Sequence, residues 1–111
     1  MQISRHQLTS ENSLKALAAS NQPFTELFRN GSLVVEIYRP KKVDLQTPHT
    51  RDEVYVVISG SGWFVNGDVR HPFEPNQLIF VPAGVVHRFE DFTEDFSTWV
   101  MFYGPEGGEG N

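Results

Sequence analysis

The sequence predicts an all-β fold, a sandwich or barrel of short strands preceded by one short helix. Segments rich in Val, Ile, Phe, Tyr and Trp recur along most of the chain, and each is only a few residues long. Pairs containing Gly, Pro or Asn separate these segments at short intervals, which is typical of antiparallel β proteins. A length of 111 residues suits one domain, so we expect residues 1–111 to form a single unit.

The expected helix spans about residues 10–19. Thr9 or Ser10 supplies an N-cap, and Leu14 and Leu17 belong to a narrow apolar stripe with helical spacing. The chain favours strands after this point.

The barrel is expected at about residues 24–103. Asn30-Gly31 and Asn66-Gly67 favour tight hairpins, because these dipeptides readily adopt positive φ. The Gly-rich, acidic segment 104–111 is expected to be a flexible tail. The expected strands are FTELFRN, SLVVEIYRP, VYVVIS, GWFVN, DVRHPF, QLIFVP, VVHRFEDF and FSTWVMFY.

Composition excludes several classes of function. A net charge of −5 argues against nucleic acid and anionic membranes as partners. The chain has no Cys, which excludes disulfides, thiolate metal ligands and iron–sulfur clusters. The N-terminus lacks the apolar region of a secretory signal, and no segment is long enough to span a membrane. We therefore expect a cytoplasmic protein.

Two segments contain the residues best suited to chemistry. The segment TPHTRDEVYVVISG contains His49 and Glu53, and NQLIFVPAGVVHRFED contains His87. Imidazole nitrogen and carboxylate oxygen together suit a divalent transition metal ion, and inward side chains converge inside a barrel. Each residue alone has an ordinary structural explanation, such as a hydrogen-bonded loop His or an exposed Glu at a strand edge. Their joint spacing favours a metal site.

These segments resemble the two sequence motifs of the cupin superfamily. The first family motif is His-x-His, three or four residues, Glu, six residues and Gly, and the second includes Pro-x-Gly, two residues and His. The matching residues are His49, Glu53 and Gly60 in the first motif and Pro82, Gly84 and His87 in the second. The resemblance implies a small single-domain cupin with a double-stranded β-helix (jelly-roll barrel), in which His49, Glu53 and His87 bind the metal.

Three positions depart from the family pattern. Asn76 replaces the opening Gly of the second motif, and Asn tolerates left-handed backbone. Asp91 stands where the family has Asn. Thr47 takes the place of the first motif His, and a Thr hydroxyl is a poor ligand for a transition metal. Gln46 lies beside this position and reaches it only if the strand bulges.

The loss of one ligand leaves two alternatives open. In the first, a two-His-one-carboxylate triad retains a divalent ion (Fe, Mn, Ni or Zn), and the protein binds a small polar organic ligand. The resemblance then implies chemistry of the dioxygenase, isomerase or decarboxylase type. In the second, the protein is a non-catalytic binding or sensing cupin whose metal is structural or absent. The sequence assigns no catalytic residue and does not decide between enzyme and binding protein.

A further set of residues is named as candidates for the pocket lining, although core packing is the better explanation of the aromatic ones and an exposed ion pair explains the Arg at least as well. His71 and His6 are expected at the surface. The resemblance also implies a homodimer, with strand edges near residues 24–39 as candidates for the contact. The candidate pocket residues are Thr47, Arg51, Tyr38, Tyr55, Phe64, Phe80 and Trp99.

Overall fold

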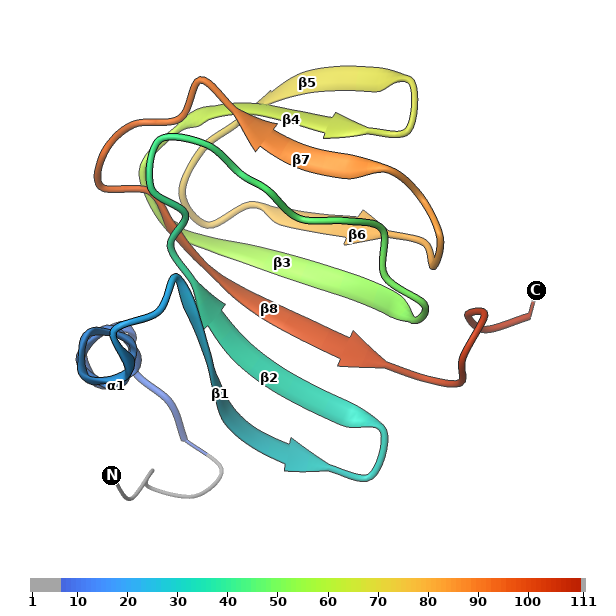
Figure 1. Ribbon diagram of the computed structural model, residues 1–111, viewed down its shortest axis with the longest axis horizontal. Coiled ribbons are helices and arrows are strands. Elements are labelled where there is room, and N and C mark those ends of the chain that lie inside the picture. Colours follow the sequence, from blue (N-terminus) through green and yellow to red (C-terminus); the bar gives the residue numbers. More distant parts are fainter. Residues whose placement is uncertain (1–6, 111) are drawn as a thin grey trace.

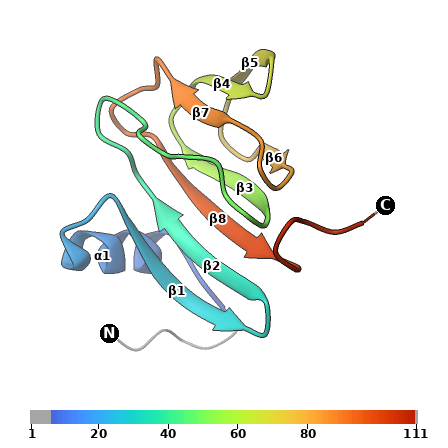
Figure 2. The ribbon, with the colours of Figure 1, turned by 45° about the vertical axis from the view of Figure 1, so that its right-hand side comes forward.

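The protein consists of two antiparallel sheets and one N-terminal helix (Figures 1 and 2). The structure is a computed structural model that describes residues 7–110. One sheet has five strands in the order β1-β2-β8-β3-β6, and the other has three in the order β5-β4-β7. The all-β prediction with one short helix is confirmed. The strands are β1 (Phe24–Asn30), β2 (Leu33–Tyr38), β3 (Asp52–Ser59), β4 (Gly62–Asn66), β5 (Val69–Phe73), β6 (Leu78–Val81), β7 (His87–Glu90) and β8 (Ser97–Tyr103).

Helix α1 (Ser10–Ser20) is capped at both ends, by a side chain at its N-terminus and by the backbone at its C-terminus. The Thr9 hydroxyl accepts a hydrogen bond from the Asn12 amide at 3.0 Å, and Asn21 ends the helix in the left-handed region at φ 57°. Leu17 is buried against Leu27 and Ile37 of the large sheet. The helix therefore covers the outer side of β1 and β2 (Figure 2).

The main core lies between the two sheets. Alternation along β3 turns Glu53, Tyr55 and Val57 to the inner face, where all three are buried. Phe89 of β7 is the centre of an aromatic cluster, with ring centroids 4.6 Å from both Phe64 and Phe96. This aromatic cluster forms much of the main core.

Backbone conformation agrees with the motif prediction at the turns. Gly60 has φ +85°, and a Cβ there would lie 2.5 Å from the Cα of Phe96, so a side chain has no room. Asn76, which replaces the usual Gly, adopts φ 68° and keeps the left-handed turn, as expected. Gly31 and Gly67 turn the two predicted hairpins with φ of 60° and 66°.

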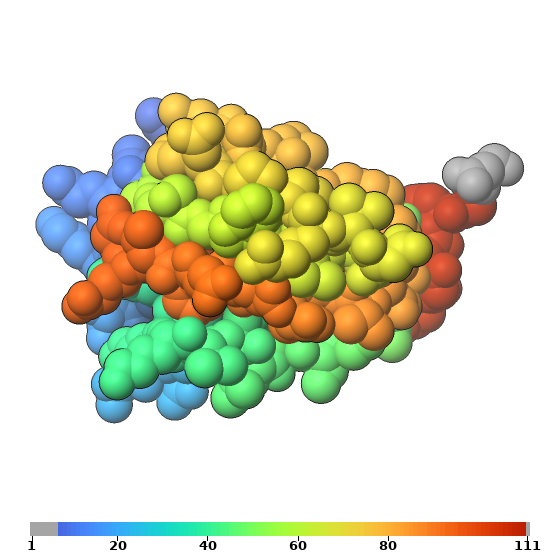
Figure 3. Space-filling model, turned by 90° about the horizontal axis from the view of Figure 1, so that it is seen from above, coloured from blue at the N-terminus to red at the C-terminus, as the bar shows by residue number. Residues whose placement is uncertain are grey.

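The segment between β2 and β3, residues 39–51, runs along the opening between the sheets (Figure 1). It is attached to β7 by a hydrogen bond from the Phe89 amide to Asp44 Oδ2 at 2.8 Å. Seen from above, the teal residues of this segment lie beside the orange residues of β7 and of the loop that follows it (Figure 3). This segment carries His49, and the hydrogen bond to β7 brings it close to His87.

The segment after β8 was expected to be a flexible tail. In the structure it returns to the start of β3, where the Gly107 amide donates to the Thr50 carbonyl and the Glu109 amide donates to Asp52. The hydrogen bond from the Glu109 amide lowers the pKa of Asp52, together with one from the Ala83 amide. Within residues 7–110 we find no helix with the length and apolarity that a membrane crossing needs.

Candidate metal centre

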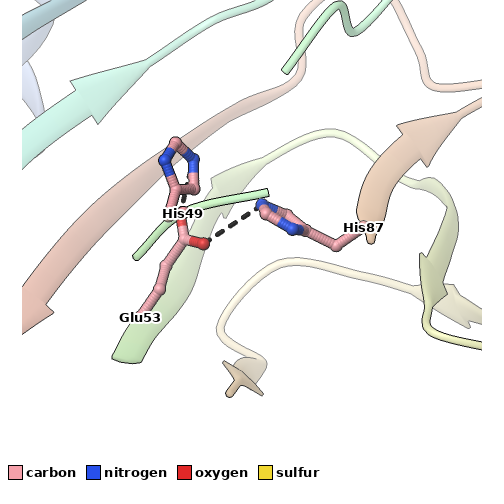
Figure 4. Close-up of side chains that lie close together, drawn as sticks. All are labelled: His49, Glu53 and His87. Carbon is pink, nitrogen blue, oxygen red and sulfur yellow. Dashed lines mark ion pairs between the residues drawn. The ribbon is translucent and has the colours of Figure 1, made fainter. Parts of the chain in front are cut away.

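Three potential metal ligands meet between the sheets (Figure 4). His49 comes from the β2–β3 segment, Glu53 from β3, and His87 is the first residue of β7. His87 Nε2 lies 3.1 Å from Glu53 Oε1, and His49 Nε2 lies 3.8 Å from Glu53 Oε2. Neighbouring ligand atoms around one transition metal ion are about 3.0–3.4 Å apart when the bonds are about 2.1 Å long. The 3.1 Å separation falls in this range, and the 3.8 Å separation lies between it and the roughly 4.2 Å expected for ligand atoms on opposite sides of one ion. The cluster is therefore small enough for one ion.

Local structure explains why the two motifs meet. Gly84 adopts φ +80° in the turn before β7, and its amide donates a 2.7 Å hydrogen bond to the His49 carbonyl. This bond attaches the loop of the first motif to the turn of the second. Glu53 reaches the same space because it lies on the inner face of β3.

Glu53 is the residue whose surroundings best suit a cation. Its side chain is 1% exposed, and neither carboxylate oxygen accepts a hydrogen bond from any residue between 7 and 110. A buried carboxylate without donors is costly, and a metal ion bound by both neighbouring imidazoles would remove that cost. The residues present therefore fit a divalent ion.

His87 is oriented for metal binding. Its Nδ1 lies 2.9 Å from the Val85 carbonyl oxygen, an acceptor that selects the tautomer with the proton on Nδ1. The Nε2 lone pair then points to Glu53. Burial lowers the pKa of His87, but the Glu53 carboxylate and the Val85 carbonyl outweigh burial, and the net pKa is raised. The pKa of His49 is lowered, chiefly by burial and against the attraction of Glu53.

Gln46 completes the ring of polar atoms around this space. Its Oε1 lies 3.2 Å from His49 Nε2 and 3.3 Å from His87 Nε2, and it accepts a 2.9 Å hydrogen bond from the Tyr55 hydroxyl. Burial and the Glu53 charge raise the pKa of Tyr55, so this hydroxyl remains a donor. Sequence reasoning placed Gln46 only next to the site, because the bend of the 39–51 segment is not encoded in the motif.

Asp44 was not predicted and is buried beside Gln46. Its carboxylate accepts from the Gln46 side-chain amide at 2.8 Å, the Tyr38 hydroxyl at 2.5 Å and the Phe89 amide at 2.8 Å. Burial raises the pKa of Tyr38, and the hydrogen bond to Asp44 adds to the effect. An Asp in a loop has no distinguishing pattern in the sequence, so only the fold shows this role.

His49 and Glu53 of the triad line a cavity of about 1370 Å³ between the 39–51 segment, α1 and the large sheet. Two of the candidate pocket residues, Tyr38 and Thr47, line the cavity, and so do Gln46 and Phe102. Glu36 also lines it and was missed. It pairs with Val100 of β8, which lines the cavity too.

The environment of Glu36 is acidic as well as partly buried. Burial raises the pKa of Glu36, and the negative charges of Glu26 and Glu53 raise it further, while Arg29 opposes them. The folded state therefore disfavours the charged form of Glu36.

The other predicted pocket residues lie elsewhere. Tyr55 and Phe64 are fully buried in the core behind the triad. Trp99 packs on the outer face against α1, with its indole nitrogen 3.3 Å from the Ser13 hydroxyl. Phe80 is 45% exposed on β6, and neither it nor Trp99 lines the cavity, because strand alternation turns both away from it.

Arg51, a candidate pocket residue, and His71, expected at the surface, both lie outside the cavity. Arg51 donates a 2.7 Å hydrogen bond to the Ser32 carbonyl near the β1–β2 turn. His71 lies half-buried on the edge strand β5, with its ring 6.1 Å from Phe64. His6 falls outside the described residues.

Comparison with known proteins identifies the family. The family model described as cupin domain matches residues 34–102, which is more than half of the chain. An uncharacterised protein of Streptomyces coelicolor, SCO3923, is 33% identical over 91 residues, covering 80% of this chain and 87% of the relative. The chain therefore belongs to the cupin domain family, and the resemblance predicted from the two motifs is confirmed.

Solved structures support the same fold. The structure of protein NMB1881 from Neisseria meningitidis matches with a TM-score of 0.64 and 17% identity, covering 84% of this chain and 97% of that one. A chain from the crystal structures of the DMSP lyases RdDddP and RnDddQII also matches with a TM-score of 0.64, at 28% identity. That match covers 75% of this chain and 47% of the lyase chain, so this protein corresponds to less than half of the lyase.

Proposed function

We propose that this cupin binds a divalent transition metal ion (Fe, Mn, Ni or Zn) through His49, Glu53 and His87. The observation that carries the proposal is the buried Glu53 carboxylate, which accepts no hydrogen bond from the described residues and lies between two imidazoles. Imidazole and carboxylate are the ligands that these ions share. The tautomer of His87 selected by the Val85 carbonyl leaves its Nε2 free to bind.

The proposal includes a small polar organic ligand in the cavity beside the triad. Gln46, Tyr38 and Glu36 supply polar groups there, while Phe102 and Val100 supply apolar walls, a combination that suits a small organic molecule. When bound, the metal supplies Lewis acidity to a ligand that coordinates it. The protein's own residues bind and orient that ligand and exclude water from the buried side of the triad.

The class of reaction is also part of the proposal. The chemistry considered is that of dioxygenases, isomerases and decarboxylases, and the likeness to a chain described as a DMSP lyase supports a catalytic role of a related kind. The second candidate is a non-catalytic binding or sensing cupin. Thr47 favours it, because this position lacks the imidazole that the family motif supplies.

Metal content tests the first step. The protein is purified without a metal-affinity tag after expression in metal-supplemented medium, and its metal is measured by mass spectrometry. We expect about one ion per chain, and a strong loss in His49→Ala, Glu53→Ala and His87→Ala. His71→Ala is the matched control, because it removes an imidazole outside the cluster. Absence of metal from the parent protein contradicts the proposal, and full metal in the three variants contradicts the residue assignment.

Turnover separates the two candidates. The iron(II)-loaded protein is tested for oxygen uptake and for product formation with a panel of small polar acids and alcohols. Product that disappears in Glu53→Ala supports the enzyme, whereas saturable binding without product supports the sensor.

Location and assembly are also proposals. We expect a homodimer, because β1 is an edge strand of the large sheet and Phe24 on it is 50% exposed. The cytoplasmic location remains the expectation from the sequence. Light scattering coupled to size-exclusion chromatography tests the dimer, and a mass of one chain contradicts it.

A further inference from the structure

We propose that the side-chain oxygen of Gln46 is the fourth protein ligand of the metal, and that Asp44 positions it. This inference rests on the proposed metal site and assigns to Gln46 the role that Thr47, at the motif position, does not fill. Thr47 is exposed, whereas Gln46 Oε1 lies beside both imidazoles.

The orientation of the Gln46 amide is determined by its neighbours. Its NH₂ group donates to Asp44 Oδ2 at 2.8 Å, and its oxygen accepts from the Tyr55 hydroxyl at 2.9 Å. A flipped amide would place its oxygen against the Asp44 carboxylate, where two acceptors would repel each other. The oxygen therefore faces the triad.

The contact of this oxygen with His87 is that of two atoms that share a cation. The preferred tautomer of His87 leaves a lone pair on Nε2, and an amide oxygen also offers only lone pairs. A neutral His87 therefore cannot donate a hydrogen bond to Gln46 Oε1 across the 3.3 Å that separates them. Lone pairs from His87 Nε2, a carboxylate and an amide converge on one space with His49 Nε2 beside them, and a cation satisfies all of them.

The distances agree with this interpretation. Gln46 Oε1 lies 3.2 Å from His49 Nε2 and 3.3 Å from His87 Nε2. Neighbouring ligand atoms of one ion are about 3.0–3.4 Å apart for bonds of about 2.1 Å. The amide oxygen thus has nearly the same spacing as the 3.1 Å between His87 Nε2 and Glu53 Oε1.

Asp44 is well suited to hold Gln46 in place. It is 7% exposed and accepts from both the backbone and the side-chain amide of Gln46. Hydrogen bonds from Tyr38 and from the Phe89 amide of β7 fix the carboxylate in turn. Second partners of this kind typically change metal affinity by about 10–100-fold when removed.

The test measures metal binding and coordination in the full chain, with cobalt(II) as the probe. Chelator-stripped protein is titrated with cobalt(II), and the visible absorption spectrum reports the ligand set. We expect Gln46→Ala to lower cobalt affinity by about 10–100-fold or more and to alter the spectrum. Gln46→Asn provides a second variant, because it keeps the amide but shortens its reach. We expect it to behave like Gln46→Ala.

Two further variants make the test specific. Thr47→Val removes the hydroxyl at the motif position, and we expect its affinity and spectrum to match the parent protein. Asp44→Asn weakens the acceptor that orients Gln46, and we expect an intermediate loss of affinity with an altered spectrum. Thermal unfolding of each stripped variant checks that the chain is folded.

The outcomes distinguish this inference from the proposed function. If the parent binds cobalt and loses it in His87→Ala, but Gln46→Ala and Gln46→Asn keep the parent affinity and spectrum, the fourth-ligand inference is overturned and the triad stands. A loss in Thr47→Val with no loss in the Gln46 variants also overturns it. If the parent itself binds no cobalt, the proposed function fails first.

Discussion

Replacing Glu53 by Gln should have opposite effects on stability in the metal-free and metal-loaded protein. In the stripped protein the carboxylate is buried, and no residue of the described chain donates a hydrogen bond to it. Gln has the same size without the charge, and its NH₂ group can donate to the free Nε2 lone pair of His87. The substitution should therefore stabilise the stripped protein.

The magnitude follows from the burial of the group. An unsatisfied buried polar group costs about 1–3 kcal/mol, and the Glu53→Gln substitution recovers a cost of this order. For a domain of this size 1 kcal/mol corresponds to about 4 °C in Tm, so the stripped variant should melt about 4–12 °C higher. The measurement is made at about pH 8.5, well above the ordinary imidazole pKa, because pairing with protonated His87 offsets part of this cost at lower pH.

Metal should reverse the order. A ligand at about a thousandfold excess over its Kd stabilises the native state by about 4 kcal/mol, or roughly 16 °C here. The parent protein should gain this shift, whereas Glu53→Gln should gain little. Differential scanning calorimetry of stripped and metal-supplemented samples measures both effects. Glu74→Gln, at an exposed glutamate, is the control and should change stability by less than about 0.5 kcal/mol.

Two results would refute this reasoning. A stripped Glu53→Gln variant less stable than the stripped parent would show that the buried carboxylate is already compensated. A variant with the full metal-dependent shift would show that Glu53 is not a ligand.

Three further predictions concern the fold and pH. Gly60→Ala should destabilise the protein by more than the roughly 1–2 kcal/mol of left-handed strain, because its Cβ would lie 2.5 Å from Phe96 Cα. Gly31→Ala, with open space around it, should cost only that strain. Equal losses of unfolding free energy in denaturant melts of the two variants would contradict this. The raised pKa of Glu36 means that its ionisation opposes folding, and this cost is present above the folded pKa and absent below the ordinary value of 4.5. Glu36→Gln should therefore raise Tm at about pH 7.5, and the difference in Tm between variant and parent should shrink as the pH falls towards the ordinary pKa of 4.5. A Tm difference that stays constant across this range would exclude titration of Glu36 as the cause. Metal should be lost in equilibrium dialysis as pH falls through the imidazole range, because protons compete for both histidines, and retention below about pH 5 would argue against histidine ligands.

The limits of the strands and helix and the conformation of the turns were predictable from the sequence. The strand limits of the barrel, Phe24 and Tyr103, agree with the predicted span, and α1 extends one residue beyond its predicted end. The left-handed turn at Asn76 was also predictable, because few residues adopt positive φ easily. These features depend on local backbone preferences, which a short segment contains in full.

Which side of a strand faces the cavity was harder to predict. Trp99 and Phe80 are aromatic and lie in strands, as pocket residues often do, yet both point away from the cavity. The side of a strand that faces inward depends on its pairing with other strands and on where α1 covers the sheet. In this protein α1 gives the outer face its own apolar cluster, so Trp99 packs there without being inside the barrel.

Thr47 stands at the motif position, but Gln46 lies at the site, and a sequence motif could not predict this. A motif assigns ligands by position along a regular strand, and by that rule the loss of His at position 47 removes a ligand. The segment 39–51 contains no assigned strand, and Asp44 attaches it to β7 by a hydrogen bond from the Phe89 amide. An irregular segment held by such contacts can present any of its side chains to the site, and here it presents Gln46. The number of ligands in a cupin of this kind should therefore be counted from the residues that hold this segment as well as from the motif.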